Sequence, residues 1–339
     1  TLARSSFSKV TAMNHTMISQ TTTDRGLDFL RTYGAIIGMI AVLAIVYFLK
    51  PAFLSPANVA NVIRQSTILI ILALGLTVVM SMRGVDLSIA QVADAAGLIA
   101  AMMIIQGYPI WAAFLVPVIF GLAVGTANAI LMAYIGIPAI IGSLGMMFIV
   151  RSGELMLTNG AEPQILFTLP RGLTKPFLFL GQGAVGPVAT LILLALAVLA
   201  VIFVLMRYTP FARQAKAVGY NVRAAFLAGI DIRMVFGAGF VVAGILSAVA
   251  GVALVSRTGI AQPRGAEPYL LDAFAAVYLG TLASRRGETN VLGTVIGGLF
   301  ITFLGNGLTI LGLGAPYRFA LNGAFILLAM AIGGLKRKN

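Results

Sequence analysis

Residues 207–233, RYTPFARQAKAVGYNVRAAFLAGIDIR, form the most polar stretch in the interior of an otherwise apolar chain. The stretch carries five basic residues and one acid, and it lies between two long apolar runs. Asn221 suits the N-cap of a helix and Gly229 suits its end, so the pattern predicts a short helix of about two turns. One side of that helix would carry Val222, Ala225 and Phe226. A short helix with a small apolar face and basic surroundings fits the groove of a partner protein, whereas a solvated loop made basic by membrane topology alone is the alternative.

The composition indicates a membrane protein with many spans. Of the 339 residues, 60% are hydrophobic and only 10% are charged, whereas a soluble domain carries about 25% charged residues. Spans would use nearly the whole length, which leaves no room for a second soluble domain. The net charge of +13 is expected to follow the orientation in the membrane, so it does not indicate nucleic-acid binding.

Several kinds of catalytic site are excluded by residues that the chain lacks. It contains no cysteine, which excludes a disulfide scaffold, a thiol nucleophile and a Cys-ligated metal site. The single histidine, His15, lies in the N-terminal tail, so imidazole chemistry inside the membrane is excluded. No HExxH or GxSxG motif occurs, and without the dipeptide Gly-Lys there is no Walker A loop for ATP phosphates. We therefore expect a protein that is not itself an enzyme.

The pattern of apolar residues predicts an all-α polytopic fold with about ten transmembrane helices. The fifth and eighth apolar segments are shorter than the roughly 20 residues that a spanning helix needs. The predicted segments are 33–49, 59–82, 86–106, 110–133, 138–152, 185–206, 234–255, 270–284, 290–313 and 316–335.

The distribution of basic residues predicts that both termini are cytoplasmic. Residues 1–32 have no sustained periodicity and no signal-peptide pattern, and we expect a flexible cytoplasmic tail there. Residues 33–335 would form the membrane domain, with 207–233 as a cytoplasmic loop, and residues 336–339 would form a basic C-terminal tail. Two sets of five spans would run in opposite orientations, which permits inverted five-helix repeats.

Three of the predicted spans carry small residues at every fourth position. Such stripes allow helix backbones to approach closely, so helix packing is their expected role. The stripes are Gly121/Gly125/Ala129, Gly239/Ala243/Ser247/Gly251 and Gly293/Gly297.

Five polar residues lie in or beside the apolar segments. Asp86 and Asp272 stand at the starts of predicted spans, where a carboxylate caps the positive end of a helix. Asp94 lies about two turns beyond Asp86, where capping does not explain it, and it would face a polar pathway or pair with a basic residue. For Asn128 and Asn306, deep in apolar runs, hydrogen bonds between helices are the first expectation and the lining of a substrate path is the second.

Two longer polar segments, 153–187 and 256–272, are predicted to be loops on the outer side of the membrane. A partner that delivers a ligand would find charge-assisted contacts on them. Taken one at a time, each basic residue is also explained as a solvated loop charge. The candidate docking residues are Arg171, Lys175, Arg257 and Arg264.

A series of stretches then identifies a resemblance. They are NVIRQSTILIILALGLTVVMSMRGVDLSIA (61–90), GTANAILMAYIGIPAIIGSLGMMFIVRSGELMLTNG (125–160), AVGYNVRAAFLAGIDI (217–232), AQPRGAEPYLLDAFAAVYLGTLASRRGETNVLGTVIGGL (261–299) and LGNGLTILGL (304–313). In this order the stretches resemble the permease subunits of bacterial ABC importers for monosaccharides, the branch for ribose, xylose, galactose and autoinducer-2. They cover most of residues 58–335, and their specificity comes from the ensemble because each one alone is weak.

The resemblance implies an assembly in the bacterial inner membrane. Two copies of the permease, or one copy with a paralogue, would surround one path within the lipid. Two separate ATPase subunits would bind ATP and Mg²⁺ on the cytoplasmic side, so this chain would hold no cofactor. A periplasmic sugar-binding protein would deliver the substrate. The resemblance also implies that the short helix seats in a groove of the ATPase, through the matching residues Asn221, Ala224, Ala225, Phe226 and Gly229.

The chain departs from the family pattern at a few positions. Gln91 and Asp94 stand where the family usually has small residues after VDLS, and Asn128-Ala129 replaces a common Asn-Gly. Arg285 and Arg286 replace smaller residues after the eighth span. These departures leave the exact substrate open. The candidate residues of the translocation path are Gln91, Asp94, Asn128 and Asn306.

Two other functions stay open at this point. The first is an ion-coupled secondary transporter that uses Asp94 as its proton or sodium site and needs no ATPase. The second is a non-transporting membrane scaffold or assembly factor, which the polar residues scattered through the spans make less attractive. A facilitated channel also remains open in principle.

Overall fold

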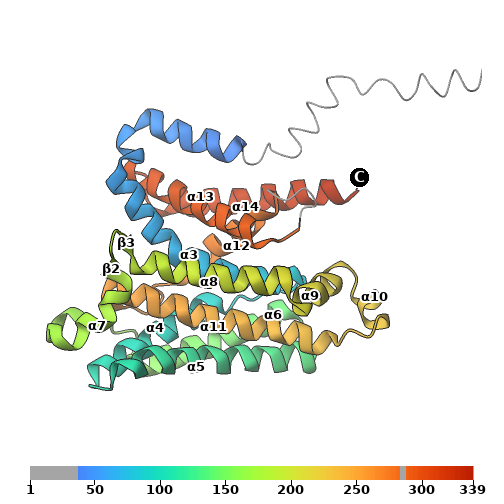
Figure 1. Ribbon diagram of the computed structural model, residues 1–339, viewed down its shortest axis with the longest axis horizontal. Helices are drawn as coiled ribbons and strands as arrows, with labels where there is room; N and C mark the ends of the chain where they lie inside the picture. Colours follow the sequence, from blue (N-terminus) through green and yellow to red (C-terminus); the bar gives the residue numbers. More distant parts are fainter. Residues whose placement is uncertain (1–36, 283–287, 339) are drawn as a thin grey trace, which may run out of the picture.

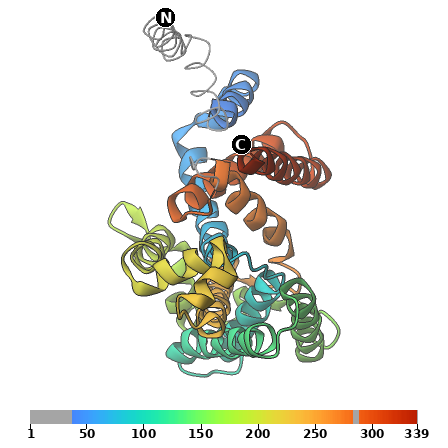
Figure 2. The same cartoon turned by 90° about the vertical axis from the view of Figure 1, so that its right-hand side faces the viewer.

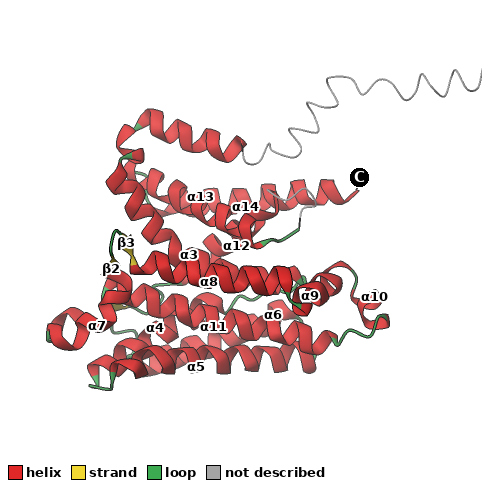
Figure 3. Ribbon diagram, viewed as in Figure 1, coloured by secondary structure: helices red, strands yellow, loops and turns green. Residues whose placement is uncertain are grey.

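The computed structural model describes residues 37–282 and 288–338, with side chains described up to residue 328. Almost all of this part of the chain is helical (Figure 3), which confirms the predicted all-α class. The strands pair only two residues each: β1 (Gln164–Ile165) with β4 (Ile260–Ala261), and β2 (Ala184–Val185) with β3 (Val188–Ala189), both antiparallel. The predicted N-terminal tail, 1–32, and the arginines at 285 and 286 lie outside the described residues.

Each of the ten predicted apolar segments overlaps one helix. The helices are Ile37–Leu49, α3 (Pro56–Ser81), α4 (Ile89–Ile105), α5 (Ile110–Ala129), α6 (Ala139–Leu157), α8 (Thr190–Tyr208), α11 (Ile232–Thr258), α12 (Glu267–Leu282), α13 (Val291–Ile310) and α14 (Ala315–Lys338). A π-helical turn, η2 (Ile130–Tyr134), continues α5, and a 3₁₀ turn, η1 (Pro51–Leu54), precedes α3. Among the described residues, six helices are long and apolar enough to cross a membrane: α3, α5 with η2, α6, α8, α11 and α13. The chain is thus a multi-pass membrane protein, while the count of ten spans, the orientation and the inverted repeats stay predictions.

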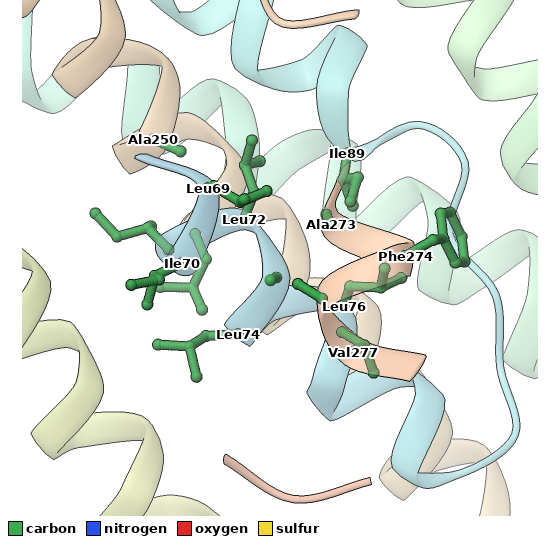
Figure 4. Packing of buried hydrophobic residues seen from close by; sticks show 14 of the residues in the cluster. Leu69, Ile70, Leu72, Leu74, Leu76, Ile89, Ala250, Ala273, Phe274 and Val277 are labelled. Atoms are coloured by element: carbon green, nitrogen blue, oxygen red, sulfur yellow. The ribbon is translucent and has the colours of Figure 1, made fainter. Parts of the chain in front are cut away.

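Helix α3 is the centre of the structure. It is buried over most of its length and contacts α8, α11, α12 and α13. Leu69, Leu72 and Leu76 of α3 lie among apolar residues of α11 and α12, such as Ala250 and Val277 (Figure 4). Helix α11 is the second central element, because it packs against α3, α4 and α5. In Figure 1, α12, α13 and α14 lie on one side of α3, and α4, α5 and α11 lie on the other.

The small-residue stripes lie where helix backbones touch, as predicted. A Cβ atom added to Gly121 of α5 would overlap the carbonyl oxygen of Gly244 on α11. One added to Gly251 of α11 would overlap the carbonyl oxygen of Ala93 on α4. One added to Gly297 of α13 would overlap a backbone atom of α12. Glycine is required at these crossings because any side chain would separate the helices.

The segments predicted to be loops contain three helices that the apolar pattern did not predict. Helix α7 (Arg171–Gln182) and the turn η3 (Leu166–Thr168) lie within 153–187, and α6 itself continues to Leu157. The stretch 207–233 contains α9 (Pro210–Tyr220) and α10 (Val222–Leu227). Helix α10 was predicted from its capping residues, but α7 and α9 were missed because they are amphipathic, so their apolar residues are too widely spaced to form a run.

The molecule has two distinct ends. Helix α7 and the β2–β3 hairpin lie at one end, and α9 and α10 lie at the other (Figure 1). The view along the long axis shows α9 and α10 close to the end of α11 (Figure 2). Helix α14 continues through residues 336–338, where the sequence predicted a short tail.

Candidate functional site

Helix α10 begins and ends where the sequence predicted. The Asn221 side chain accepts a hydrogen bond from the Ala224 N–H at 3.0 Å, and this bond caps the helix. Gly229 follows the helix with φ +78°, a left-handed conformation that glycine adopts without strain. Its N–H donates to the Phe226 carbonyl oxygen at 3.0 Å. Asn221 and Gly229 therefore determine where α10 begins and ends through contacts within this short stretch.

The outward side of α10 carries large apolar side chains beside the exposed Arg223. Phe226 is 68% exposed and Leu227 78%, and Val222 is also exposed. Ala225, which the sequence placed on the same side as Val222 and Phe226, is only 3% exposed. It packs inward in a cluster with Met82, Ala215, Val218 and Val235. Ala225 therefore holds α10 against the bundle and does not belong to its exposed face.

Helix α9 fixes α10 to the membrane helices. Its first turn is capped by Thr209, whose hydroxyl accepts from the Ala212 N–H at 3.4 Å. At its other end, a Cβ atom on Gly219 would overlap the carbonyl oxygen of Ser81 at the end of α3. The backbone of α9 thus lies directly against the central helix, and a force on α10 would reach α3 through a close-packed contact.

A buried polar cluster lies between α4 and α6. We define the polar cluster as Gln91 and Asp94 of α4 with Arg151 and Glu154 of α6. The Gln91 side-chain amide donates a hydrogen bond to the Glu154 carboxylate. Asp94 accepts a hydrogen bond of 2.6 Å from the Ala266 N–H, just before α12. The structure thus brings together two predicted path residues with two residues that the sequence analysis did not select.

Two buried carboxyl oxygens of the polar cluster have no hydrogen-bond partner among the residues that the structure describes. Asp94 is 8% exposed and Glu154 only 2%. The two oxygens are Asp94 Oδ2 and Glu154 Oε1. Glu154 was missed because the predicted fifth span ends at residue 152, which leaves Glu154 in the predicted loop 153–187. Its spacing of three from Arg151 on a helix is the signal that could have found it.

Two ion pairs lie beside the polar cluster at the surface. Arg151 Nη1 lies 3.9 Å from Glu267 Oε2, and Arg264 Nε lies 3.7 Å from the same oxygen. The Glu267 and Arg264 side chains are more than half exposed. Arg264 has φ +68°, so the chain turns sharply before α12 begins. The segment 262–267 therefore connects the polar cluster to the molecular surface.

The remaining path candidates lie outside the polar cluster. Asn128 donates to the Ser88 hydroxyl at 3.0 Å and is buried. Asn306 of α13 and Asn58 of α3 exchange two hydrogen bonds, of 2.8 and 3.1 Å. Both asparagines thus link separate elements, which was the first expectation for them.

The capping predictions for two aspartates are wrong. Asp86 precedes the N-terminus of α4 by three residues, and it accepts from the Ser88 N–H and hydroxyl at 2.9 and 2.6 Å. Asp272 lies inside α12, which begins at Glu267, and it forms an ion pair with Arg318 of α14. Asn322 also donates to Asp272. The carboxylate therefore joins two helices across a buried interface.

The four candidate docking residues lie in three places. Arg171 and Lys175, both exposed on α7, line a hollow of about 580 Å³ together with apolar side chains such as Phe167 and Phe179. Arg257 lies at the end of α11, where its carbonyl oxygen accepts from the Gln182 side chain at 3.0 Å. Arg264 belongs to the ion pairs beside the polar cluster. Of the four candidate docking residues, only Arg171 and Lys175 thus line the hollow.

Comparison with known proteins identifies the family. Residues 58–330 match the family model described as a branched-chain amino acid transport system / permease component. The chain is 33% identical to the ribose import permease protein RbsC of Haemophilus influenzae over 89% of this chain and 93% of that protein. It is 28% identical to the galactose/methyl galactoside import permease protein MglC of Escherichia coli K12, over 91% and 96% of the two chains.

A third relative extends this series. The autoinducer 2 import system permease protein LsrC of Photorhabdus laumondii is 29% identical over 89% of this chain and 88% of that protein. No solved structure matches the chain. The family model leaves out the helix Ile37–Leu49 but spans α3 to α13 and most of α14. The chain therefore belongs to the ABC-importer permease family that includes these ribose, galactose and autoinducer 2 permeases.

Proposed function

We propose that this chain is the membrane-spanning permease subunit of an ABC importer that moves a monosaccharide or related polyol into the cytoplasm. ATP hydrolysis would take place in a separate ATPase subunit, and this chain would have no ATPase site of its own. The family and the names of the relatives support the transport role, since they are import permeases for ribose, galactose and autoinducer 2. From this transport role we infer that the protein lies in the bacterial inner membrane.

The exposed face of α10 is the observation that carries this proposal. Phe226 and Leu227, an aromatic and an aliphatic side chain, are exposed on α10, and α10 lies at one end of the molecule (Figure 1). Exposed apolar anchors of this kind mark a surface that binds another protein. The basic residues around α10 would place this end in the cytoplasm. An ATPase that holds α10 in a groove would move α3 through the contact at Gly219 when it closes.

The opposite end of the molecule would receive the substrate. The hollow on α7 offers Arg171 and Lys175 beside apolar side chains, which suits a periplasmic binding protein with an acidic rim. Arg257 and Arg264 would add contacts at the same end. A second copy of this chain, or a paralogue, would complete the path, with both termini of each copy in the cytoplasm.

Asp94 supports a second candidate function. A buried carboxyl group with an unpartnered oxygen is the residue that an ion-coupled transporter would use as its proton or sodium site. A protonophore distinguishes the two functions when cellular ATP is held constant. Uptake that stops under this treatment would support ion coupling, and uptake that continues would support the ATPase-driven mechanism.

The test of the proposed function is a pair of substitutions at one exposed position. Phe226→Asp should abolish uptake of radiolabelled ribose or galactose, because a charge at the centre of the apolar face prevents docking. Phe226→Leu keeps the face apolar and should retain most of the uptake. Both variants are compared at equal expression in the membrane. Normal uptake by Phe226→Asp would contradict the proposal that α10 couples the two subunits.

A further inference from the structure

We propose that the polar cluster is a binding station for the hydroxyl groups of a neutral sugar-like substrate inside the membrane domain. The inference rests on the proposed function and adds to it the residues that contact the substrate and the chemistry they select. Gln91, Asp94 and Glu154 would accept and donate hydrogen bonds to the substrate, and Arg151 would balance their charge.

Packing alone does not explain why the two carboxyl groups of the polar cluster are buried. Carboxyl groups inside a membrane domain are costly to bury and persist where they are paired or where they serve a function. Asp94 and Glu154 are close enough to repel each other electrostatically. Each keeps one buried oxygen that has no hydrogen-bond partner in the described part of the chain, and leaving a buried polar group unsatisfied is costly. By contrast, Asp272 has a partner for both oxygens, as expected of a structural carboxylate.

The unused hydrogen-bonding groups define the ligand. Among the described residues, two carboxyl oxygens have no hydrogen-bond donor, so a ligand that donates at least two hydrogen bonds would satisfy them. Sugar hydroxyl groups donate one hydrogen bond each and also accept, which suits acceptors that lie beside the donors of Gln91 and Arg151. A carboxylate can accept from two adjacent hydroxyl groups at once.

The charges of the polar cluster favour a neutral ligand over a cation or an anion. The Arg151 guanidinium acts electrostatically on both Asp94 and Glu154, so it offsets part of their negative charge and weakens the attraction for a bound cation. An anion would meet two carboxyl groups. A neutral molecule with several hydroxyl groups avoids both repulsions and satisfies both acceptors.

The segment before α12 covers this station. Its Ala266 N–H binds Asp94 Oδ1, and Glu267 at its surface side pairs with Arg151. Both contacts join α4 and α6 to the segment 262–267. A substrate that enters from this end would replace the Glu267 contact of Arg151, so the ion pair also lies at the entrance of the station.

Two nearly isosteric substitutions test the station without removing its structural contacts. Asp94→Asn keeps an oxygen that accepts from Ala266, and Glu154→Gln keeps an oxygen that accepts from Gln91. Each replaces an unpartnered acceptor by a donor. Transport of radiolabelled D-ribose and D-galactose is measured in proteoliposomes that contain the permease, its ATPase and its binding protein. We expect each variant to lower the maximal uptake rate about tenfold or more, since each replaces an oxygen that would accept a hydrogen bond from the substrate by an amide donor.

Glu162→Gln is the matched control, because Glu162 is an exposed glutamate of the segment between α6 and β1. It should transport like the wild type. The thermal midpoint and the recovery of the ATPase with each variant show whether the fold is intact. Wild-type uptake rates for both Asp94→Asn and Glu154→Gln would overturn the station.

Two further results separate the inference from the function on which it rests. Loss of sugar uptake in Phe226→Asp together with unchanged uptake in both Asp94→Asn and Glu154→Gln would retain the importer and reject the station. Uptake of labelled choline, but of neither sugar, by the wild type would reject the neutral substrate class. Reduced sugar uptake in both station variants, with an intact fold, would support the inference.

Discussion

Helix α10 and the polar cluster differ in how the sequence determines them. Helix α10 is fixed by residues within one short stretch, with Asn221 as its cap and Gly229 at its end. The polar cluster is assembled by contacts between residues 63 and 172 positions apart. The first region is exposed and apolar, and the second is buried and polar. The comparison shows that a docking element can be specified by local signals, whereas a polar site inside the bundle depends on the packing of the whole fold.

The largest effect on stability is expected at a long-range polar contact. Asp272→Ala leaves the Arg318 guanidinium without its buried partner. Removing one member of a buried ion pair costs about 3–5 kcal/mol, because the other charge stays uncompensated. The measurement is the free energy of unfolding in a mild detergent. The double variant Asp272→Leu with Arg318→Met should recover much of the loss. Equal losses in the single and double variants would contradict a role for the ion pair itself.

A smaller but clear loss is expected at a helix crossing. Gly251→Ala places a methyl group against the Ala93 carbonyl oxygen, so α4 and α11 must separate. Such overpacking costs about 1–3 kcal/mol. The matched control is Gly145→Ala on α6, where an added Cβ has no atom within 4 Å. We expect a lower thermal midpoint for Gly251→Ala alone. Equal midpoints for both variants would show that the crossing tolerates a methyl group.

A local effect is expected at the cap of α10. Asn221→Ala removes the hydrogen bond to the Ala224 N–H and should destabilise this helix by about 1 kcal/mol. Hydrogen exchange of the amides in residues 222–227 measures the effect, and the rest of the bundle should keep its protection. Asn221→Asp retains an acceptor oxygen and should exchange like the wild type. Faster exchange throughout the bundle in Asn221→Ala would contradict the local nature of the cap.

The smallest effect is expected at an exposed ion pair. Arg264→Ala removes a contact of 3.7 Å between two side chains that are more than half exposed. Pairs of this kind contribute at most about 1 kcal/mol because water and salt screen them. The free energy of unfolding should therefore change little. A loss comparable to that of Asp272→Ala would show that Arg264 has a structural role that its exposure does not indicate.

The ten long apolar helices were predictable because the membrane environment requires each of them to be a continuous apolar run. The stripe that contains Gly121 and Gly125 was predictable in the same way, since close packing in lipid depends on small residues. The role of Asp272 could not be predicted from the sequence, because the residues that pair with it lie in another helix. Glu154 was misplaced for a related reason: its helix extends beyond the apolar run that marks it.

In the candidate site, too, the features that could be predicted from the sequence are those that depend only on neighbouring residues of the chain. Asn221 and Gly229 carry signals that need no tertiary structure. The inward position of Ala225 needs the contact with α9 and α11, which no spacing within α10 reveals. The apolar residues of α7 were too dispersed to indicate a helix, so the hollow that contains Arg171 and Lys175 could be found only from the structure.

The most direct test of the central claim is the recovery of an ATPase with the tagged chain. Wild type, Phe226→Leu and Phe226→Asp are purified from membranes of the native host in mild detergent, and the proteins that accompany each are quantified by mass spectrometry. The proposed function predicts that a Walker A ATPase accompanies the wild type and Phe226→Leu and is lost with Phe226→Asp. Equal recovery with all three variants would show that α10 is not the docking element, and recovery of the chain alone in every case would contradict coupling to a separate ATPase.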